Sequence, residues 1–129
     1  MNRGLALVCV VDDDDEVRDA MRNLLASAGY DTVAFASAEA CLSFARLGEV
    51  HLALFDVRLP GMDGFALHHA LVARGLRLAV VFVSGHVDAA MAARAVAAGA
   101  IALLQKPVDG DVLLGVVERA LGTGGAGAV

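Results

Sequence analysis

The feature that most constrains the fold is an alternation of short apolar runs with longer helical patterns. The first, third and fourth runs are almost continuously apolar, which is typical of strands buried on both faces of a sheet. Between the first two runs, apolar residues recur at three- and four-residue spacing from Val17 to Ala28, as on a helix with one buried face. The expected strands are Leu5–Val11, Thr32–Ala36, Val50–Phe55, Leu78–Val83 and Ile101–Leu104.

Capping residues place the helices between these strands. Asp15 is a candidate cap for the first helix, which Gly29 would end. Five strand–helix units with right-handed crossovers predict an α/β fold with a doubly wound, five-stranded parallel sheet. The other helices are expected over Ser37–Leu47, from Asp63-Gly64 to about Ala73, from Asp88 to Gly99, and from Asp109 or Asp111 onward.

Composition limits where the chain works and what it binds. No apolar run approaches the ~18–20 residues of a membrane-spanning helix. The first run continues into acidic residues rather than a cleavage site, so it does not resemble a signal peptide. We therefore expect a cytoplasmic protein with no membrane partner. The net charge of −5, with basic residues scattered singly, argues against nucleic-acid binding by this chain alone.

Polar residues follow four of the five expected strands. Asp12 and Asp13 follow the first strand, Asp56 the third, Ser84 the fourth and Lys106 the fifth. In a doubly wound sheet the functional crevice lies at the carboxyl ends of the strands. We therefore expect these five side chains to meet at one edge of the sheet.

Three carboxylates at one edge need a counter-charge. Two of them ~4 Å apart repel by about 4 kcal/mol at an effective dielectric near 20, so the group should hold protons or recruit a cation. An oxygen-only ligand set with open positions favours Mg²⁺, with Mn²⁺ as a second candidate. We interpret the neighbouring acidic residues Asp14, Asp15, Glu16 and Asp19 as solvated groups at a helix N-terminus.

A hydroxyl and an ammonium beside the acidic cluster indicate phosphoryl chemistry. Asp56 would be the nucleophile, and Ser84 and Lys106 would bind the phosphoryl oxygens. Lys106 is the only lysine in the chain, which argues against an ordinary surface residue.

With these residues in place, the chain resembles the receiver domain of bacterial two-component response regulators over about residues 5–121. The segments that carry the resemblance are "VVDDDDEVRDAMRNLL", "LFDVRLPGMDGFAL", "VVFVSGHVDAAMAARAVAAGA" and "LLQKP", and they are most similar to the FixJ-type subgroup. The resemblance implies a flavodoxin-like (CheY-like) fold and a phosphoryl group accepted on Asp56 from a sensor histidine kinase. It implies Mg²⁺ held by Asp12, Asp13, Asp56 and the main-chain carbonyl of Arg58.

The resemblance also assigns the residues around the phosphoryl group. It implies that Ser84 swings toward the phosphoryl oxygens and that Lys106 pairs with them. Arg58 and His86 stand where receivers tune the lifetime of the phosphoryl group. Leu103 stands where receivers usually carry an aromatic switch residue, and a leucine can repack but has no ring to swing.

The resemblance has consequences for domains and partners. We expect a receiver domain over residues 1–121, followed by a flexible glycine-rich tail or the start of a linker over residues 122–129. FixJ-type regulators usually continue into a DNA-binding domain, so the expected target is a downstream protein or a missing C-terminal output domain. A homodimer through the fourth and fifth helices is a further expectation.

Two alternatives stay open at this point. A haloacid-dehalogenase-like phosphatase also uses a strand-end Asp-x-Asp, which Asp12 and Asp14 could imitate. That interpretation leaves Asp56 without a task and lacks a later acidic pair at a strand end. The other alternative is a pseudo-receiver that keeps the fold as an interaction module but is never phosphorylated.

Overall fold

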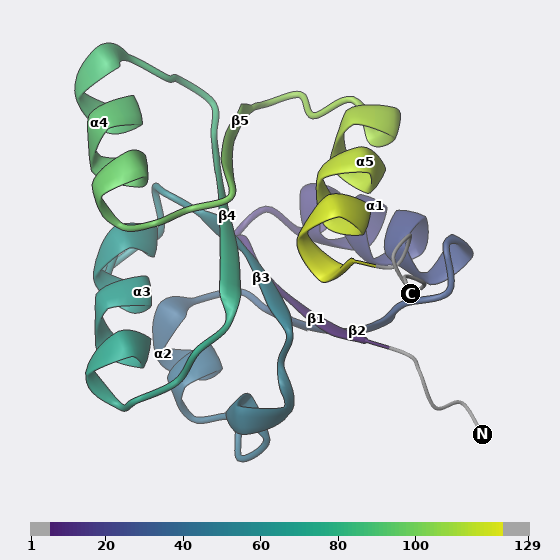
Figure 1. Ribbon diagram of the computed structural model, residues 1–129, viewed down its shortest axis with the longest axis horizontal. Helices are drawn as coiled ribbons and strands as arrows, with labels where there is room; N and C mark the ends of the chain where they lie inside the picture. The colour runs from purple at the N-terminus through teal and green to yellow at the C-terminus, as the bar shows by residue number, and fades with distance from the viewer. Residues whose placement is uncertain (1–5, 123–129) are drawn as a thin grey trace.

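A five-stranded parallel sheet forms the centre of the computed structural model, which describes residues 6–122 (Figure 1). The strand order is β2-β1-β3-β4-β5, and each neighbouring pair is parallel. This order confirms the predicted doubly wound sheet. The strands are β1 (Leu7–Val11), β2 (Asp31–Phe35), β3 (Leu52–Asp56), β4 (Ala79–Ser84) and β5 (Ala102–Gln105).

Five helices cover the two faces of the sheet. Helices α1 and α5 pack on one face, and α2, α3 and α4 pack on the other (Figure 1). Within the described part of the chain, no helix combines the length and the apolar character of a membrane span. The helices are α1 (Asp15–Ser27), α2 (Ala38–Leu42), α3 (Gly64–Ala73), α4 (Ala89–Ala97) and α5 (Gly110–Leu121), with a short 3₁₀ turn, η1, at Leu47–Glu49.

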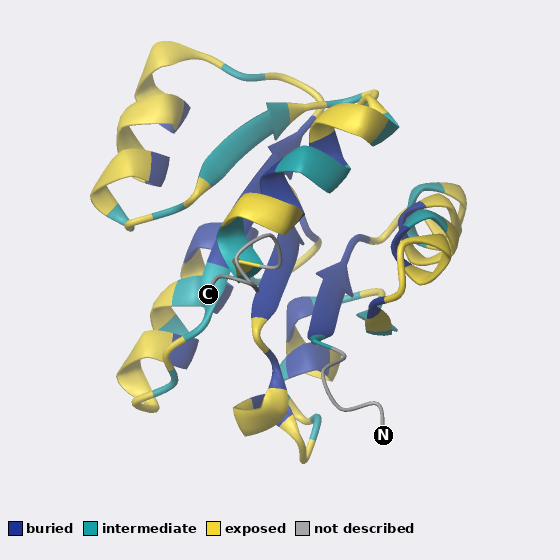
Figure 2. Cartoon of the chain, turned by 45° about the vertical axis from the view of Figure 1, so that its right-hand side comes forward, coloured by how far each residue is buried: buried dark blue, intermediate teal, exposed yellow. Residues whose placement is uncertain are grey.

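The central strands feed two hydrophobic cores. All five residues of β1 are buried: Val8 and Val10 face α1 and α5, whereas Cys9 and Val11 face the other helices. Figure 2 shows the same contrast, with buried strands at the centre and exposed outer helix faces. This double burial explains the almost continuous apolar runs in the sequence.

Two of the predicted helix boundaries were wrong. Asp14, not Asp15, caps α1, because its side chain accepts hydrogen bonds from the backbone N–H groups of Glu16 and Val17. Helix α2 stops at Leu42 instead of reaching Leu47. The hydroxyl of Ser43 bonds the carbonyl of Glu39 at 3.2 Å at this end, and serine side chains compete in this way with helix continuation.

The other predicted helix starts hold. Asp63 and Asp88 each cap a helix by accepting a backbone hydrogen bond, and Asp109, rather than Asp111, caps α5. The ends of the predicted strands that fall among the described residues lie within two residues of the observed ends. Leu5 and the predicted tail from residue 123 onward lie outside the described residues.

Candidate functional site

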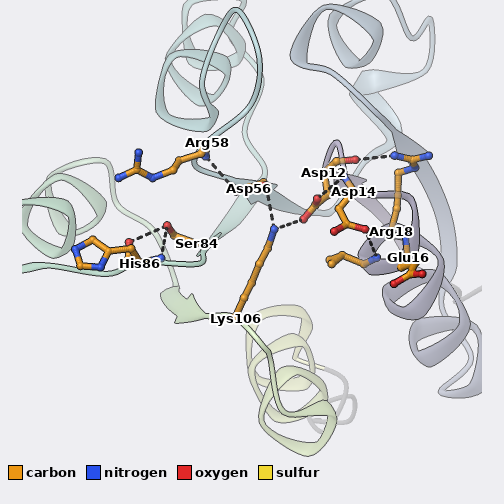
Figure 3. Close-up of polar contacts among 10 residues, drawn as sticks. Asp12, Asp14, Glu16, Arg18, Asp56, Arg58, Ser84, His86 and Lys106 are labelled. Atoms are coloured by element: carbon orange, nitrogen blue, oxygen red, sulfur yellow. Dashed lines mark hydrogen bonds and ion pairs between the residues drawn. The ribbon is translucent and has the colours of Figure 1, made fainter.

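The carboxyl edge of the sheet brings the predicted polar side chains together (Figure 3). Asp12 follows β1, Asp56 ends β3, Ser84 ends β4 and Lys106 follows β5. Among the described residues, the polar side chains that are buried are Asp12, Asp56 and Ser84. Burial of polar groups is therefore concentrated at this edge.

Lys106 lies between two of the carboxylates. Its Nζ is 2.8 Å from Asp12 Oδ2 and 3.0 Å from Asp56 Oδ2, and it donates a hydrogen bond to Asp56. The contact with Asp12 is an ion pair without hydrogen-bond geometry, which leaves the buried Asp12 Oδ2 without a hydrogen bond. The ammonium group therefore supplies part of the counter-charge that the carboxylates at this edge need.

The local environment raises the pKa values of both Asp56 and Lys106. Burial raises the pKa of Asp56, and the hydrogen bonds from Lys106 and from the Arg58 N–H only partly oppose it. Burial alone would lower the pKa of Lys106, but Asp12 and Asp56 outweigh it and raise that pKa. The lysine is therefore charged at neutral pH, and the ionised form of Asp56 is held at a cost.

Asp56 is fixed from two further directions. Its Oδ1 accepts a hydrogen bond of 3.1 Å from the Arg58 N–H. A Cβ at Gly64, the first residue of α3, would lie 2.4 Å from the main-chain oxygen of Asp56, closer than any side chain tolerates. From the sequence, Gly64 was predicted only as a helix start, and its contact with Asp56 was not predicted. The signal was a glycine where a better helix former would be expected after a cap.

The predicted metal ligands form a cluster. Asp12, Asp13 and Asp56 each offer one carboxylate oxygen, and these oxygens lie within 4.8 Å of one another. Asp13 is exposed, whereas Asp12 is anchored: its Oδ1 accepts the Asp14 N–H at 2.9 Å. A buried carboxylate oxygen without a hydrogen bond, beside two other carboxylates, fits a hard divalent cation.

Arg18 supports this cluster from α1. Its Nη1 donates a 2.8 Å hydrogen bond to the main-chain oxygen of Asp12, and its guanidinium group also pairs with Asp15. Arg18 was not among the site residues predicted from the sequence, because an arginine one turn into an amphipathic helix is common on solvated helix faces.

Ser84 lies at the expected edge but faces the loop between β4 and α4. Its hydroxyl donates to the His86 carbonyl at 2.8 Å and accepts the His86 N–H at 3.2 Å. Figure 3 shows the hydroxyl turned toward His86. The predicted contact with a phosphoryl group would require a different side-chain orientation.

The remaining predicted residues surround the site without covering it. The side chains of Arg58 and His86 are exposed and extend away from Asp56 (Figure 3). His86 Nε2 lies 3.9 Å from Asp88 Oδ2. Leu103 is partly buried, pairs in register with Phe82 of β4 and packs on the core beneath α3 and α4.

Comparison with known proteins identifies the family that this geometry suggests. A model of the response regulator receiver domain family matches residues 8–118, which is most of the chain. The chain belongs to the response regulator receiver domain family. A receiver is a signalling domain rather than a metabolic enzyme, so the match decides against the haloacid-dehalogenase-like phosphatase.

Individual relatives agree with this family. The chain is 40% identical over 117 residues to the tetrathionate response regulatory protein TtrR of Salmonella typhimurium, covering 91% of the chain and 57% of the relative. It is 37% identical over 115 residues to the transcriptional regulatory protein FixJ of Azorhizobium caulinodans, covering 89% of the chain and 54% of that protein. The receiver is therefore of the FixJ-like type, and the chain spans about half the length of these relatives.

Solved structures give the same fold. A CheY-like receiver domain protein from Methanospirillum hungatei JF-1 superposes with a TM-score of 0.82 at 30% identity, covering 93% of this chain and 96% of that one. The flavodoxin-like receiver fold is thus confirmed by both sequence and structure.

Proposed function

We propose that this receiver accepts a phosphoryl group on Asp56 from a phosphohistidine of a sensor histidine kinase. The observation that carries the proposal is the setting of Asp56. It is a buried carboxylate, its two oxygens are held by Lys106 and by the Arg58 N–H, and it lies beside two further carboxylates. A buried, oriented carboxylate next to a cation is suited to act as a nucleophile.

The transfer is a displacement at phosphorus. An oxygen of Asp56 forms the new P–O bond as the P–N bond of the phosphohistidine breaks, and the imidazole leaves with its electron pair. Lys106, now paired with Asp12 and Asp56, would re-pair with a phosphoryl oxygen. Mg²⁺, or Mn²⁺ in its place, held by Asp12, Asp13, Asp56 and the carbonyl of Arg58, would offset the charge on the transferring oxygens.

The same site would slowly reverse its own modification. Water attacks the phosphorus of the aspartyl phosphate, releasing inorganic phosphate and the free Asp56 carboxylate. The chain itself would thus catalyse phosphotransfer and autodephosphorylation only. Arg58 and His86 would partly shield the phosphoryl group from this water. If Arg58→Ala and His86→Ala leave the dephosphorylation rate within about twofold of the wild-type rate, the shielding role is wrong.

Ser84 would convert the modification into a change of shape. Its hydroxyl must give up both contacts with His86 before it can bind a phosphoryl oxygen. Phosphorylation would therefore favour a state with a rearranged β4–α4 loop that the free protein already samples. Leu103 would repack beside Ser84 without the swinging ring that receivers usually carry.

The switched surface would reach a partner outside this chain segment. Val96 on α4 and Val112 on α5 are exposed apolar residues on the helices expected to form a homodimer. We propose residues 1–121 as the receiver, acting on a downstream protein or a C-terminal output domain and not on nucleic acid by itself. Sedimentation of phosphorylated protein that stays monomeric at high concentration would remove the homodimer.

The experiment that tests the function uses a small phosphoryl donor. The protein is incubated with Mg²⁺ and acetyl phosphate and weighed intact, beside Asp56→Asn and the matched control Asp31→Asn at the opposite edge. We expect one added phosphoryl group in the wild type and in the control, and none in Asp56→Asn or without Mg²⁺. An unmodified wild type, with acetyl phosphate and with kinase donors, would favour the pseudo-receiver instead.

A further inference from the structure

Helices α3 and α4 are anchored very differently. Helix α3 buries four residues, which are Gly64, Phe65, Leu67 and Leu71. Helix α4 buries only Met91 and Ala95, and its outer surface is made mostly of exposed alanines. Figure 2 shows α4 as a largely exposed helix. The position of α4 therefore depends on few contacts.

One of these contacts joins α4 directly to α3. The guanidinium carbon of Arg94 lies 4.3 Å from the ring centroid of Phe65, within the range of a cation–π interaction. Phe65 in turn packs on Phe82 of β4, with ring centroids 4.4 Å apart. Arg94 makes no ion pair within residues 6–122, so this ring is its specific partner. Both residues line a groove of about 660 Å³ between the two helices.

Helices α3 and α4 are connected to the site through different residues. Helix α3 begins at Gly64, whose N–H donates to the Val57 carbonyl at 2.9 Å and whose backbone leaves no space for a Cβ beside the main-chain oxygen of Asp56. Helix α4 follows a loop that Ser84 holds through its two hydrogen bonds with His86. A Ser84 hydroxyl turned toward a phosphoryl group would lose both hydrogen bonds with His86, whereas the contact of Gly64 with Asp56 does not involve Ser84. The Arg94–Phe65 contact joins α4, which follows this loop, to α3.

We propose that Arg94 is a positioning residue that holds α4 against α3 in the unphosphorylated arrangement. This inference rests on the proposed phosphorylation of Asp56. In this receiver, where position 103 is a leucine and not an aromatic residue, the contact between α4 and α3 would set the equilibrium between the two arrangements.

The expected effect follows from linkage. If the contact exists only in the unphosphorylated arrangement, its removal raises the population of the other arrangement and the reactivity of Asp56 by the same factor. An exposed cation–π contact corresponds to a change of about two- to fivefold. A purely structural arginine, which only covers α3, would lower stability without accelerating phosphorylation.

The test compares initial rates of phosphorylation by subsaturating acetyl phosphate with Mg²⁺, followed by intact mass. We expect Arg94→Gln to react about two- to fivefold faster than the wild type, with Arg94→Lys between them. Arg77→Gln, which removes the same charge from an exposed arginine at the opposite edge of the sheet, should react at the wild-type rate. Loss of a positive charge near an anionic donor would slow the reaction, so charge alone gives the opposite sign.

A second arm tests whether Phe65 is the partner. In a Phe65→Leu background, Arg94→Gln should no longer change the rate, because the ring is gone. The same acceleration in that background, or an unchanged or slower rate in Arg94→Gln alone, overturns the inference. Should Phe65→Leu not fold, the comparison of Arg94→Gln with Arg94→Lys and Arg77→Gln still decides. A wild type that reacts normally beside an unaccelerated Arg94→Gln refutes this inference alone, whereas an unreactive wild type refutes the proposed function as well.

Discussion

The two edges of the sheet differ in whether their charged and polar side chains are buried or exposed. At the carboxyl edge Asp12 and Asp56 are buried, and Lys106 lies between them. At the amino edge polar residues such as Asp31 and His51 are exposed around an open recess of about 710 Å³. Withdrawing charges from water costs several kcal/mol for each ion unless they are well paired. The carboxyl edge is therefore shaped by a task other than stability, whereas the polar residues of the amino edge stay in contact with water.

The largest expected effect comes from Asp56→Asn, which should affect phosphorylation and stability in opposite directions. It should abolish phosphorylation. It should leave the free energy of unfolding at pH 7 unchanged or higher by about 1 kcal/mol, because burial raises the pKa of Asp56 and the ionised form opposes folding. Since the folded-state pKa is raised, the gain should shrink as the pH falls toward the pKa of the unfolded carboxyl. Urea unfolding at pH 7 and pH 4 measures it, and a clear loss of stability at pH 7 would contradict the comparison.

Lys106→Met should damage both properties. It leaves Asp12 and Asp56 without their shared counter-charge, so we expect a loss of about 1–3 kcal/mol and phosphorylation slowed by about 100-fold. If the carboxylates also bind Mg²⁺, the ion should raise the melting temperature of this variant more than that of the wild type. Equal shifts in the two proteins would argue against a metal at the cluster.

Gly64→Ala should be destabilising because of the close approach to Asp56. The added methyl group meets the main-chain oxygen at 2.4 Å, and we expect a loss of about 1–3 kcal/mol in urea unfolding. Gly110→Ala is the matched control, since Gly110 also follows an Asp cap at the start of a helix. Its new Cβ would only touch Leu24 at 3.5 Å, so helix propensity should make this variant neutral or more stable. Similar losses in both variants would refute the role of the contact.

The smallest effect is expected at the amino edge. His51→Ala removes the acceptor of a 3.0 Å hydrogen bond from the Leu7 N–H, which should cost about 0.5–1.5 kcal/mol. The rate of phosphorylation by acetyl phosphate should stay at the wild-type value. A change of more than about threefold in that rate would mean that the amino edge influences the reaction at the carboxyl edge, contrary to the contrast drawn between them.

The fold and the meeting of the site residues could be predicted from the sequence because few topologies suit five strand–helix units. Once the strands are parallel, their carboxyl ends share one edge, and Asp12, Asp56, Ser84 and Lys106 must follow them there. The helix caps at Asp63 and Asp88 were equally accessible, because a cap depends on a few neighbouring residues.

The side-chain arrangement within the site could not be predicted in the same way. Lys106 pairs with both carboxylates, and Ser84 turns toward His86, because several partners compete for each group at short range. The choice of Asp14 over Asp15 as a cap and the early end of α2 turn on equally small differences in local hydrogen bonding. Such choices depend on three-dimensional packing that no residue pattern records.

The central claim is that Asp56 itself carries the phosphoryl group. Borohydride reduces an acyl phosphate to an alcohol, so it converts a phosphorylated aspartate into homoserine at the same position. After treatment with Mg²⁺ and acetyl phosphate followed by borohydride, peptide sequencing by mass spectrometry should find homoserine at position 56 and aspartate at positions 12 and 13. Homoserine at another aspartate, or at none, would contradict the account.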